Sequence, residues 1–360
     1  MSQETNSRSS PNPDRELIID GSTGEGGGQI LRTSLALSAL LNRPVDIINI
    51  RRGRKNPGLQ PQHLTAVRAM ATIARARVDG AELGSQRLRF APQGIAAGRY
   101  TFDVAAVRAS AGSVGLIFQA VAPALFVASE PSQLTLKGGT HVPWSPPTTY
   151  LEMVFLPALE RLGLRGTMKT LRWGWYPRGG GLVEAMITPG RPIAPLHLED
   201  RGELVSLEYL SVVSNLPRSI AHRQRDRLLH RLQEKGLSAR GEILEAPSPG
   251  KGTFVFLLAH YQSIRAGFGA LGERGKPAER VADEAFAAFW AHHASGAAVE
   301  KHLADQLVVY LALAEGPSRF TTSEVTQHLL TNLWVIEQFL PVTFTVEGVV
   351  GQPGAVEVHI

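Results

Sequence analysis

The sequence predicts an α/β protein with two or three domains. Segments with strand and helix patterns alternate along most of its 360 residues, a length that exceeds one typical domain of roughly 150 residues. A glycine-rich stretch, Gly21–Arg32, joins an apolar run to a segment with helical spacing, as at a junction of strand, loop and helix. The proline-rich segment Pro189–Pro195 is typical of a linker, and the composition changes beyond it.

The glycine-rich loop is typical of an anion site. Glycines let backbone N–H groups approach a ligand closely, and the N-terminus of the following helix favours negative charge. Two standard phosphate motifs do not fit, because Gln29 stands where one needs a lysine and the other its third glycine. Glu25 would repel a phosphate unless a divalent cation lay between them, which indicates Mg²⁺ carried with a nucleotide. The alternative is an ordinary tight turn.

Composition excludes several classes of protein. The 37 basic and 32 acidic residues give a net charge of +5, which favours a polyanionic partner without requiring one. The absence of cysteine excludes disulfides, zinc–thiolate sites and a thiol nucleophile. Polar residues 1–14 predict a disordered tail rather than a secretory signal, and the apolar run Val114–Ala128 is too short for a membrane span. We therefore expect a cytoplasmic protein with no membrane partner.

A strand, a basic cluster and a helix follow the first helix. The strand Val45–Ile50 runs directly into residues 51–55 (RRGRK), which suit phosphate contact about as well as a solvated charged surface. Gln62 and His63 open a helix that extends to Ala76, and we expect His63 to cap or pack rather than to catalyse. The next predicted elements are strands at 88–90 and 100–104 and the apolar helix 114–128, which contains Gln119.

A related arrangement then recurs. A strand at 134–136 precedes the rigid, aromatic loop Pro143–Pro147, which suits either one wall of a pocket for a flat ring or a plain loop. A helix at 154–162 and strands at 167–173 and 183–187 come next, with a basic, glycine-rich turn between these strands. The combination of strands, helices and a glycine-rich turn recurs roughly every 80 to 90 residues, a spacing that could reflect internal repetition.

Beyond the linker the pattern indicates a separate small α/β module. Its predicted elements are a strand at 204–213, a helix at 217–235, a strand at 253–260 and a helix at 277–294. Five arginines on the first of these helices are most simply a solvated face. They are Arg218, Arg223, Arg225, Arg227 and Arg231.

Polar residues gather on the last two predicted helices. The helix at 297–313 carries three polar side chains within one turn: His302, Asp305 and Gln306. The segment 321–340 presents an imidazole, a hydroxyl and an amide within one turn: His328, Thr331 and Asn332. In the same segment Thr321 and Glu324 have the spacing of a capping box.

Six motifs in fixed order closely resemble those of the RNA 3′-terminal phosphate cyclases. They are GEGGGQILR, RRGRKNPGLQPQHL, AELGSQRL, GGTHVPWSPP, YPRGGG, and ADQLV followed by QHLLTN. The resemblance implies ATP-dependent conversion of a terminal 3′-phosphate on RNA into a 2′,3′-cyclic phosphodiester, with Mg²⁺ or Mn²⁺ as the metal. It implies three steps: ATP adenylylates a histidine, AMP passes to the RNA 3′-phosphate, and the neighbouring 2′-hydroxyl displaces AMP.

The resemblance also implies roles for individual residues. It assigns His328 as the nucleophile and Glu25 as the metal-binding residue, and an ordinary histidine with a pKa of about 6.5 is mostly neutral at pH 7. The positions that match phosphate contacts are Arg32, Arg51, Arg54, Gln62 and Gln119. The positions that match contacts with the nucleotide are Pro146, Tyr150, Asp305 and Gln306. His302 stands where relatives carry a tyrosine that stacks on adenine.

The implied fold is a large domain of three related units, each with paired helices on a sheet, and a smaller inserted α/β domain. We place the large domain at residues 15–190 and 295–360, and the inserted domain at 191–294. The unit resembles those of enolpyruvyl transferases, which spread a basic constellation over two large lobes. Two other functions stay open: a non-catalytic, RNA-binding relative in ribosome assembly, and a general adenylyltransferase for polynucleotide ends, including DNA ends. The sequence does not predict an oligomeric state.

Overall fold

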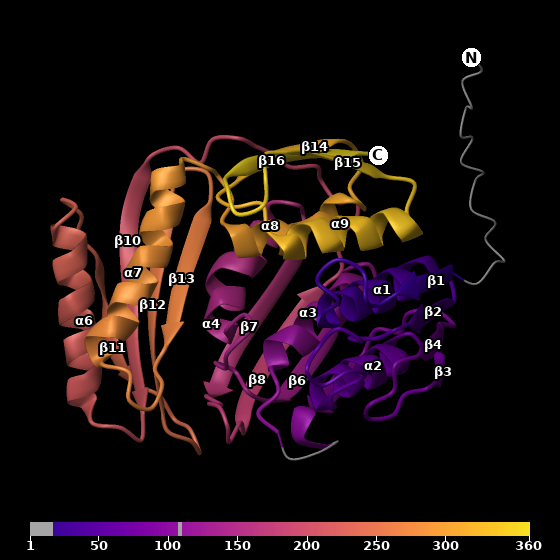
Figure 1. Cartoon of the computed structure of the whole chain (residues 1–360), viewed down its shortest axis with the longest axis horizontal. Coiled ribbons are helices and arrows are strands. Elements are labelled where there is room, and N and C mark those ends of the chain that lie inside the picture. Colours follow the sequence, from indigo (N-terminus) through magenta and orange to yellow (C-terminus); the bar gives the residue numbers. More distant parts are fainter. Residues whose placement is uncertain (1–16, 107–109) are drawn as a thin grey trace.

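The computed structural model describes residues 17–106 and 110–360, so the disordered tail predicted for residues 1–14 lies outside the described part of the chain. The described residues form four sheets of four strands each, and helices pack against them. This arrangement confirms the predicted α/β class (Figure 1). Within the same residues, no helix is long and apolar enough to cross a membrane.

The first sheet follows the order of the predicted elements. Its strands are β1 (Leu17–Asp20), β2 (Val45–Ile48), β3 (Arg77–Asp79) and β4 (Leu88–Ala91), and its helices are α1 (Gly28–Leu41) and α2 (Pro61–Ile73). The strand order is β1-β2-β4-β3, with β1 and β2 parallel and the other pairs antiparallel. The predicted strand 45–50 ends at Ile48, because Asn49 and Arg51 adopt left-handed conformations with φ of 52° and 54°.

The second sheet repeats this arrangement. Its strands are β5 (Arg99–Asp103), β6 (Ser132–Gly138), β7 (Arg165–Arg172) and β8 (Gly181–Thr188), in the order β5-β6-β8-β7. A short 3-10 turn, η1 (Val104–Ala106), precedes helix α3 (Val114–Phe126). The helix predicted at 154–162 begins earlier, directly after Pro147, as α4 (Thr148–Tyr150), the π-helical turn η2 (Leu151–Phe155) and α5 (Leu156–Glu160).

The third sheet joins distant parts of the chain. Its strands are β9 (His197–Leu198), β14 (Ser318–Thr322), β15 (Thr343–Glu347) and β16 (Gly354–His359), in the order β15-β16-β14-β9. Its helices are α8 (Lys301–Leu311) and α9 (Gln327–Phe339). In each of the three sheets the first two strands in the chain are parallel and the other neighbours antiparallel. We propose that this shared topology reflects the internal repetition expected from the spacing of the motifs.

We call each of these three sheets, together with its helices, a unit. The fourth sheet interrupts the third unit between β9 and α8. Its strands are β10 (Leu204–Ser214), β11 (Arg240–Glu245), β12 (Gly252–Tyr261) and β13 (Arg265–Leu271), in the order β11-β10-β12-β13, with helices α6 (Arg218–Gln233) and α7 (Ala278–Ser295). Two of the arginines predicted to form a solvated face also connect α6 to α7 through ion pairs. Arg223 pairs with Glu279 and Arg227 with Asp283, each at 2.8 Å.

Strand β12 explains how the fourth sheet attaches to the rest of the molecule. Phe254, Phe256 and Leu258 pack into the large core that joins the other three sheets. The alternate residues Val255 and Leu257 pack into a second core beneath α6 and α7. Side chains alternate across a strand, so a continuous apolar run is what burial on both faces requires. The fourth sheet is therefore an integral layer of the protein (Figure 1).

Of two predicted helix caps, one is wrong and one is confirmed. The capping box predicted at Thr321 and Glu324 is wrong, because Thr321 lies in β14 and α9 begins six residues later, at Gln327. The actual cap is Thr326, whose hydroxyl accepts a hydrogen bond from the Leu329 N–H at 3.0 Å. The prediction that His63 caps its helix is confirmed, since its Nδ1 accepts a hydrogen bond from the backbone N–H before the helix.

Stability should depend on the buried histidine His292. Its side chain is 2% exposed, and burial lowers its pKa to about 3. In the unfolded chain the pKa of His292 has the ordinary value of about 6.5, so the unfolded state binds protons more tightly than the folded state. The free energy of unfolding therefore falls as the pH drops from about 6.5 towards 3. We expect His292→Leu to reduce the slope of unfolding free energy against pH by up to about 1.4 kcal/mol per pH unit.

Urea unfolding at several pH values between 7 and 4 measures this slope. His197→Leu on β9 provides the control, because it removes an imidazole that the fold leaves exposed. Equal slopes in wild type and His292→Leu would contradict the expectation.

Candidate active site

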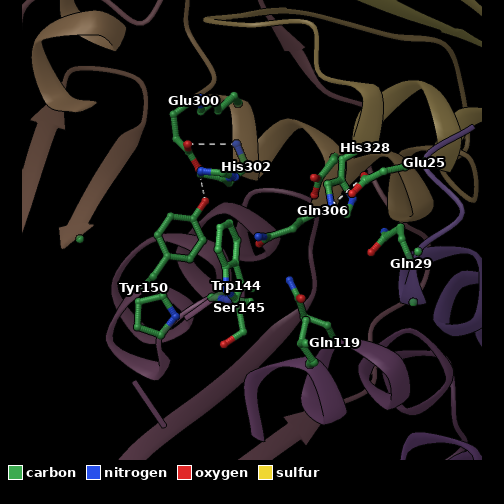
Figure 2. Close-up of a pocket in the computed structure, with 18 of the residues that line it drawn as sticks. Glu25, Gln29, Gln119, Trp144, Ser145, Tyr150, Glu300, His302, Gln306 and His328 are labelled. Carbon is green, nitrogen blue, oxygen red and sulfur yellow. Dashed lines mark hydrogen bonds and ion pairs between the residues drawn. The ribbon is translucent and has the colours of Figure 1, made fainter. Parts of the chain in front are cut away.

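A cavity of about 800 Å³ opens where the first, second and third units meet the fourth sheet. The residues predicted for the site come from α1, α2, α3, α4, α8, α9 and the loops before them. All twelve line this one cavity: Glu25, Arg32, Arg51, Arg54, Gln62, Gln119, Pro146, Tyr150, His302, Asp305, Gln306 and His328. The fold thus gathers positions that are up to about 300 residues apart in the chain (Figure 2).

The glycine-rich loop fits closely between neighbouring helices. A Cβ atom on Gly28 would lie 2.5 Å from Nε2 of His63, so any side chain there would displace the histidine. Helix α1 begins at Gly28 without a capping side chain, which leaves its first N–H groups free of side-chain partners. The segment is therefore both a tight turn and a helix N-terminus suited to an anion, and the two alternatives are compatible.

The centre of the site is a contact between α9 and the glycine-rich loop. Nε2 of His328 lies 3.0 Å from Oε2 of Glu25 (Figure 2). The other carboxylate oxygen of Glu25 accepts a hydrogen bond from Arg54 at 2.8 Å, and Arg54 also donates to the Glu25 carbonyl at 2.9 Å. An imidazole, a carboxylate and a guanidinium thus meet at one edge of the cavity.

The electrostatics of His328 favour its neutral form. Burial lowers its pKa below the ordinary value, and the nearby charge of Arg32 lowers it further, whereas Glu25 opposes the shift. The side chain is nevertheless 45% exposed, so it is open to a ligand in the cavity. A neutral and accessible imidazole has the lone pair that a nucleophile needs.

Cationic groups dominate the same side of the cavity. Arg32 donates to the side-chain oxygen of Gln29 at 2.8 Å, and although burial lowers its pKa to about 10, it stays protonated at neutral pH. Arg51 is anchored by donating to backbone carbonyl groups, including that of Gly58 at 3.0 Å. Together with Arg54 these side chains form a set of charged hydrogen-bond donors of the kind that suits phosphate oxygens. The alternative of a purely solvated basic cluster does not describe Arg51 and Arg54, which are half-buried.

Two other polar residues of the predicted turn on α9 hold helices together. Thr331 Oγ1 accepts a hydrogen bond from the Glu25 N–H at 3.2 Å, which joins the glycine-rich loop to α9. The Asn332 amide donates to the Asp305 carbonyl at 2.7 Å and accepts from the Thr33 hydroxyl at 2.7 Å. These bonds fix α1, α8 and α9 relative to one another, so Thr331 and Asn332 position the site rather than face a ligand.

The opposite end of the cavity is organised by Tyr150. Its hydroxyl donates to Oε1 of Glu300, and Glu300 caps α8 by accepting from the N–H groups of His302 and Leu303 at 3.0 and 2.7 Å. Burial raises the pKa of Tyr150 well above its ordinary value, and Glu300 adds to the shift. The start of α8, which carries His302, is thus held against α4, which carries Tyr150 (Figure 2).

Asp305 and Gln306 lie farther along α8. Burial raises the pKa of the Asp305 carboxyl well above its ordinary value, an effect that the charge of Arg32 partly offsets. Oε1 of Gln306 is buried and has no hydrogen-bond partner among the described residues. A buried acceptor without a partner costs free energy in the absence of a ligand, which points to a donor on the molecule that fills the cavity.

Several residues of the cavity were not predicted. The fourth sheet and α7 supply one wall, formed by Gly267, Phe268, Gly269, Ala288, Ala291 and His292. Small apolar residues in a separate module carry no signal of chemistry, and only the packing of the modules brings them to the site. Lys301 and Glu324 also line the cavity and pair at 2.7 Å.

The residues present fit a metal ion only in a limited way. No group of three or more histidine or acidic side chains within residues 17–106 and 110–360 could hold an ion by itself. Oε2 of Glu25, however, is buried, and among the described residues its one polar neighbour is Nε2 of His328 at 3.0 Å. Magnesium often binds through one or two carboxylates and the phosphates of its substrate. Glu25 therefore suits an ion that arrives with a nucleotide.

Comparisons with known proteins identify the family of this chain. Residues 23–346 match the family model described as RNA 3′-terminal phosphate cyclase. A protein of that name from Methylococcus capsulatus is 47% identical over 329 residues, which cover 90% of this chain and 91% of the relative. Another from Pyrococcus furiosus is 42% identical, covering 95% of this chain and 98% of the relative. The chain therefore belongs to the RNA 3′-terminal phosphate cyclase family.

Proposed function

We propose that this protein uses ATP to convert an RNA 3′-terminal phosphate into a 2′,3′-cyclic phosphodiester. The observation that carries the proposal is the neutral, accessible His328 beside Glu25, on the cationic side of a cavity large enough for a nucleotide. The relatives that share most of the chain are named for this activity. The resemblance in sequence motifs supports the same enzyme.

The chemistry divides into three displacements at phosphorus. Nε2 of His328 attacks the α-phosphate of ATP, a nitrogen–phosphorus bond forms, and pyrophosphate leaves. An oxygen of the RNA 3′-phosphate then attacks the same phosphorus, and the imidazole is released. Finally the RNA 2′-hydroxyl loses its proton and attacks the 3′-phosphate, so that AMP leaves and the ring closes. The lowered pKa of His328 supports the first step, because only the neutral imidazole can attack.

The cationic residues support the handling of phosphates. Arg32, Arg51 and Arg54 offer charge-assisted hydrogen bonds to the triphosphate and to the RNA end. Gln62 and Gln119 line the same region and can orient phosphate oxygens without adding charge. Magnesium at Glu25 would offset the charge of the phosphates and of departing pyrophosphate.

The far end of the cavity suits the nucleoside. Pro146 and Tyr150 provide a rigid wall, and His302 lies at the start of α8 across from them. The unpartnered Oε1 of Gln306 supports a hydrogen bond from an amino or hydroxyl group of the nucleotide, and Asp305 lies beside it. We infer a large domain of residues 15–190 and 295–360 and an inserted domain that closes one wall of this pocket. The expected start of the inserted domain at residue 191 moves to a point after Leu198, because β9 pairs with β14 in the sheet of the large domain.

Replacement of His328 tests the covalent step. Incubation with ATP labelled at the α-phosphate should label the wild-type protein, whereas His328→Ala should lower labelling roughly 10⁴-fold or more, as loss of a covalent nucleophile does. His302→Ala changes another histidine of the same cavity and should retain the label at saturating ATP. Full labelling of His328→Ala would overturn the proposed nucleophile.

Replacement of Glu25 tests the metal. Glu25→Gln keeps the size of the side chain but removes the charge that would hold the ion. The concentration of Mg²⁺ that gives half-maximal labelling should rise at least about tenfold, since loss of even an indirect contact typically has that effect. Glu324→Gln alters another acidic residue of the cavity and serves as the control. An unchanged response to Mg²⁺ in Glu25→Gln would contradict this role.

The RNA end tests the final step. RNA with a 3′-phosphate and a 2′-hydroxyl should yield the cyclic product, whereas the 2′-deoxy end should accumulate the adenylylated 3′-phosphate because it lacks the attacking group. Separation of labelled products on a gel distinguishes them. Failure of AMP to reach either end, in a protein that still binds RNA, would instead identify a non-catalytic relative. Efficient transfer to 5′-phosphates would identify a general end adenylyltransferase.

A further inference from the structure

One aromatic side chain that lines the cavity lies almost entirely in solvent. Trp144 lines the cavity and is 98% exposed, the largest value among the exposed large hydrophobic residues described. The other four of the five tryptophans are buried or half-buried. An indole is large and mostly apolar, so a protein rarely leaves one entirely in water unless a ligand or partner covers it.

The backbone at this position is unusual as well. Trp144 has a φ of 64°, in the left-handed region that bulky residues avoid. The loop around it is fixed, because the Ser145 hydroxyl donates to the Val142 carbonyl at 3.0 Å and the Thr148 N–H donates to the Thr140 carbonyl at 3.0 Å. A strained residue on a fixed loop is held in one place by its surroundings, and such residues cluster at ligand sites.

The surroundings of the indole suit a flat ring. In Figure 2 the Trp144 ring is directed into the cavity on the side of His302, and Tyr150 lies beside it. Tyr150 is buried and bonded to Glu300, so it forms a fixed boundary rather than a mobile cover. The cationic groups that suit phosphates lie on the other side, around Glu25.

We propose that the Trp144 indole stacks on a nucleobase bound in the cavity. This inference rests on the proposed function, which brings two nucleobases to the site: the adenine of ATP and the terminal base of the RNA. Both have the same chemistry, a planar π-system that stacks on an indole with little dependence on sequence. A purine should stack better than a pyrimidine, because its larger ring overlaps more of the indole.

Intrinsic fluorescence tests stacking without requiring catalysis. Trp144 is the one exposed tryptophan, all five lying within the described residues, so a base stacked on it should quench part of the emission. Titration with ATP alone, and separately with a short RNA ending in a 3′-phosphate, shows which source provides the base. The quench should be lost in Trp144→Phe, which lacks the indole. Absence of a quench with both ligands, or an equal quench in Trp144→Phe, would overturn the proposal.

Kinetics test whether the stack matters for the reaction. Trp144→Leu should raise the half-saturating concentration of ATP in self-labelling, or of RNA in cyclisation, roughly 5- to 150-fold, the range for loss of one base–aromatic stack. Trp144→Phe keeps an aromatic ring and should give half-saturating concentrations close to wild type. A merely apolar contact would not distinguish Phe from Leu. Tyr176→Ala, which removes an aromatic side chain that is 69% exposed and is not among the residues lining the cavity, is the matched control.

The outcomes separate the two proposals. Unchanged half-saturation for both ATP and RNA in Trp144→Leu would overturn the stacking role while the cyclase activity stands. If wild type shows the quench, and Trp144→Phe loses it, in a protein that neither labels nor cyclises, the nucleobase platform stands and the proposed reaction falls. Because Trp144 is exposed, thermal melting should be the same in wild type and both variants.

Discussion

The site depends on the contact between the glycine-rich loop and α9. Near one end of the chain Glu25 is fixed by Thr331 through its backbone, and through its side chain it faces His328 and Arg54. Glycine at position 24 permits this approach, because a Cβ atom there would lie 2.4 Å from Oγ1 of Thr331 on α9. The two segments are about 300 residues apart, so the reacting groups exist as a site only when the first and third units are packed together.

The charge balance follows from that contact. A carboxylate beside an imidazole would ordinarily favour the charged imidazolium, yet burial and the neighbouring guanidinium groups prevail at His328. Arg54 donates to one oxygen of Glu25, and among the described residues the other oxygen faces Nε2 of His328. In the proposed reaction, a nucleotide with its metal would add interactions to this carboxylate and to the cationic groups around it.

Much of the site could be predicted because its residues lie in local motifs. Glu25 was informative from its charge alone, since a carboxylate in a phosphate-binding loop needs a cation. The same approach failed at Thr321, because a capping-box spacing also occurs by chance within a strand, and the real cap, Thr326, has no acidic partner at the required spacing. The end of β2 depends on the left-handed conformation of Asn49, which hydrophobic alternation does not report.

Other features could not be predicted because they arise from tertiary packing. Glu300 lies one residue before α8 and matches no sequence motif, but it accepts a hydrogen bond from the hydroxyl of Tyr150, 150 positions away. The wall formed by Gly267, Ala288 and their neighbours comes from the fourth sheet, whose apolar strand β12 indicated burial but not what it packs against. Sequence patterns describe each element, whereas the cavity depends on how the elements meet.

The central claim is that His328 carries AMP during the reaction. The most direct measurement is to incubate the protein with ATP and Mg²⁺ in the absence of RNA, digest it under conditions that preserve phosphoramidates, and locate the adduct by mass spectrometry. We predict AMP on the peptide that contains His328 and on none of the other ten of the eleven histidines. AMP on a lysine or on a different histidine would contradict the claim.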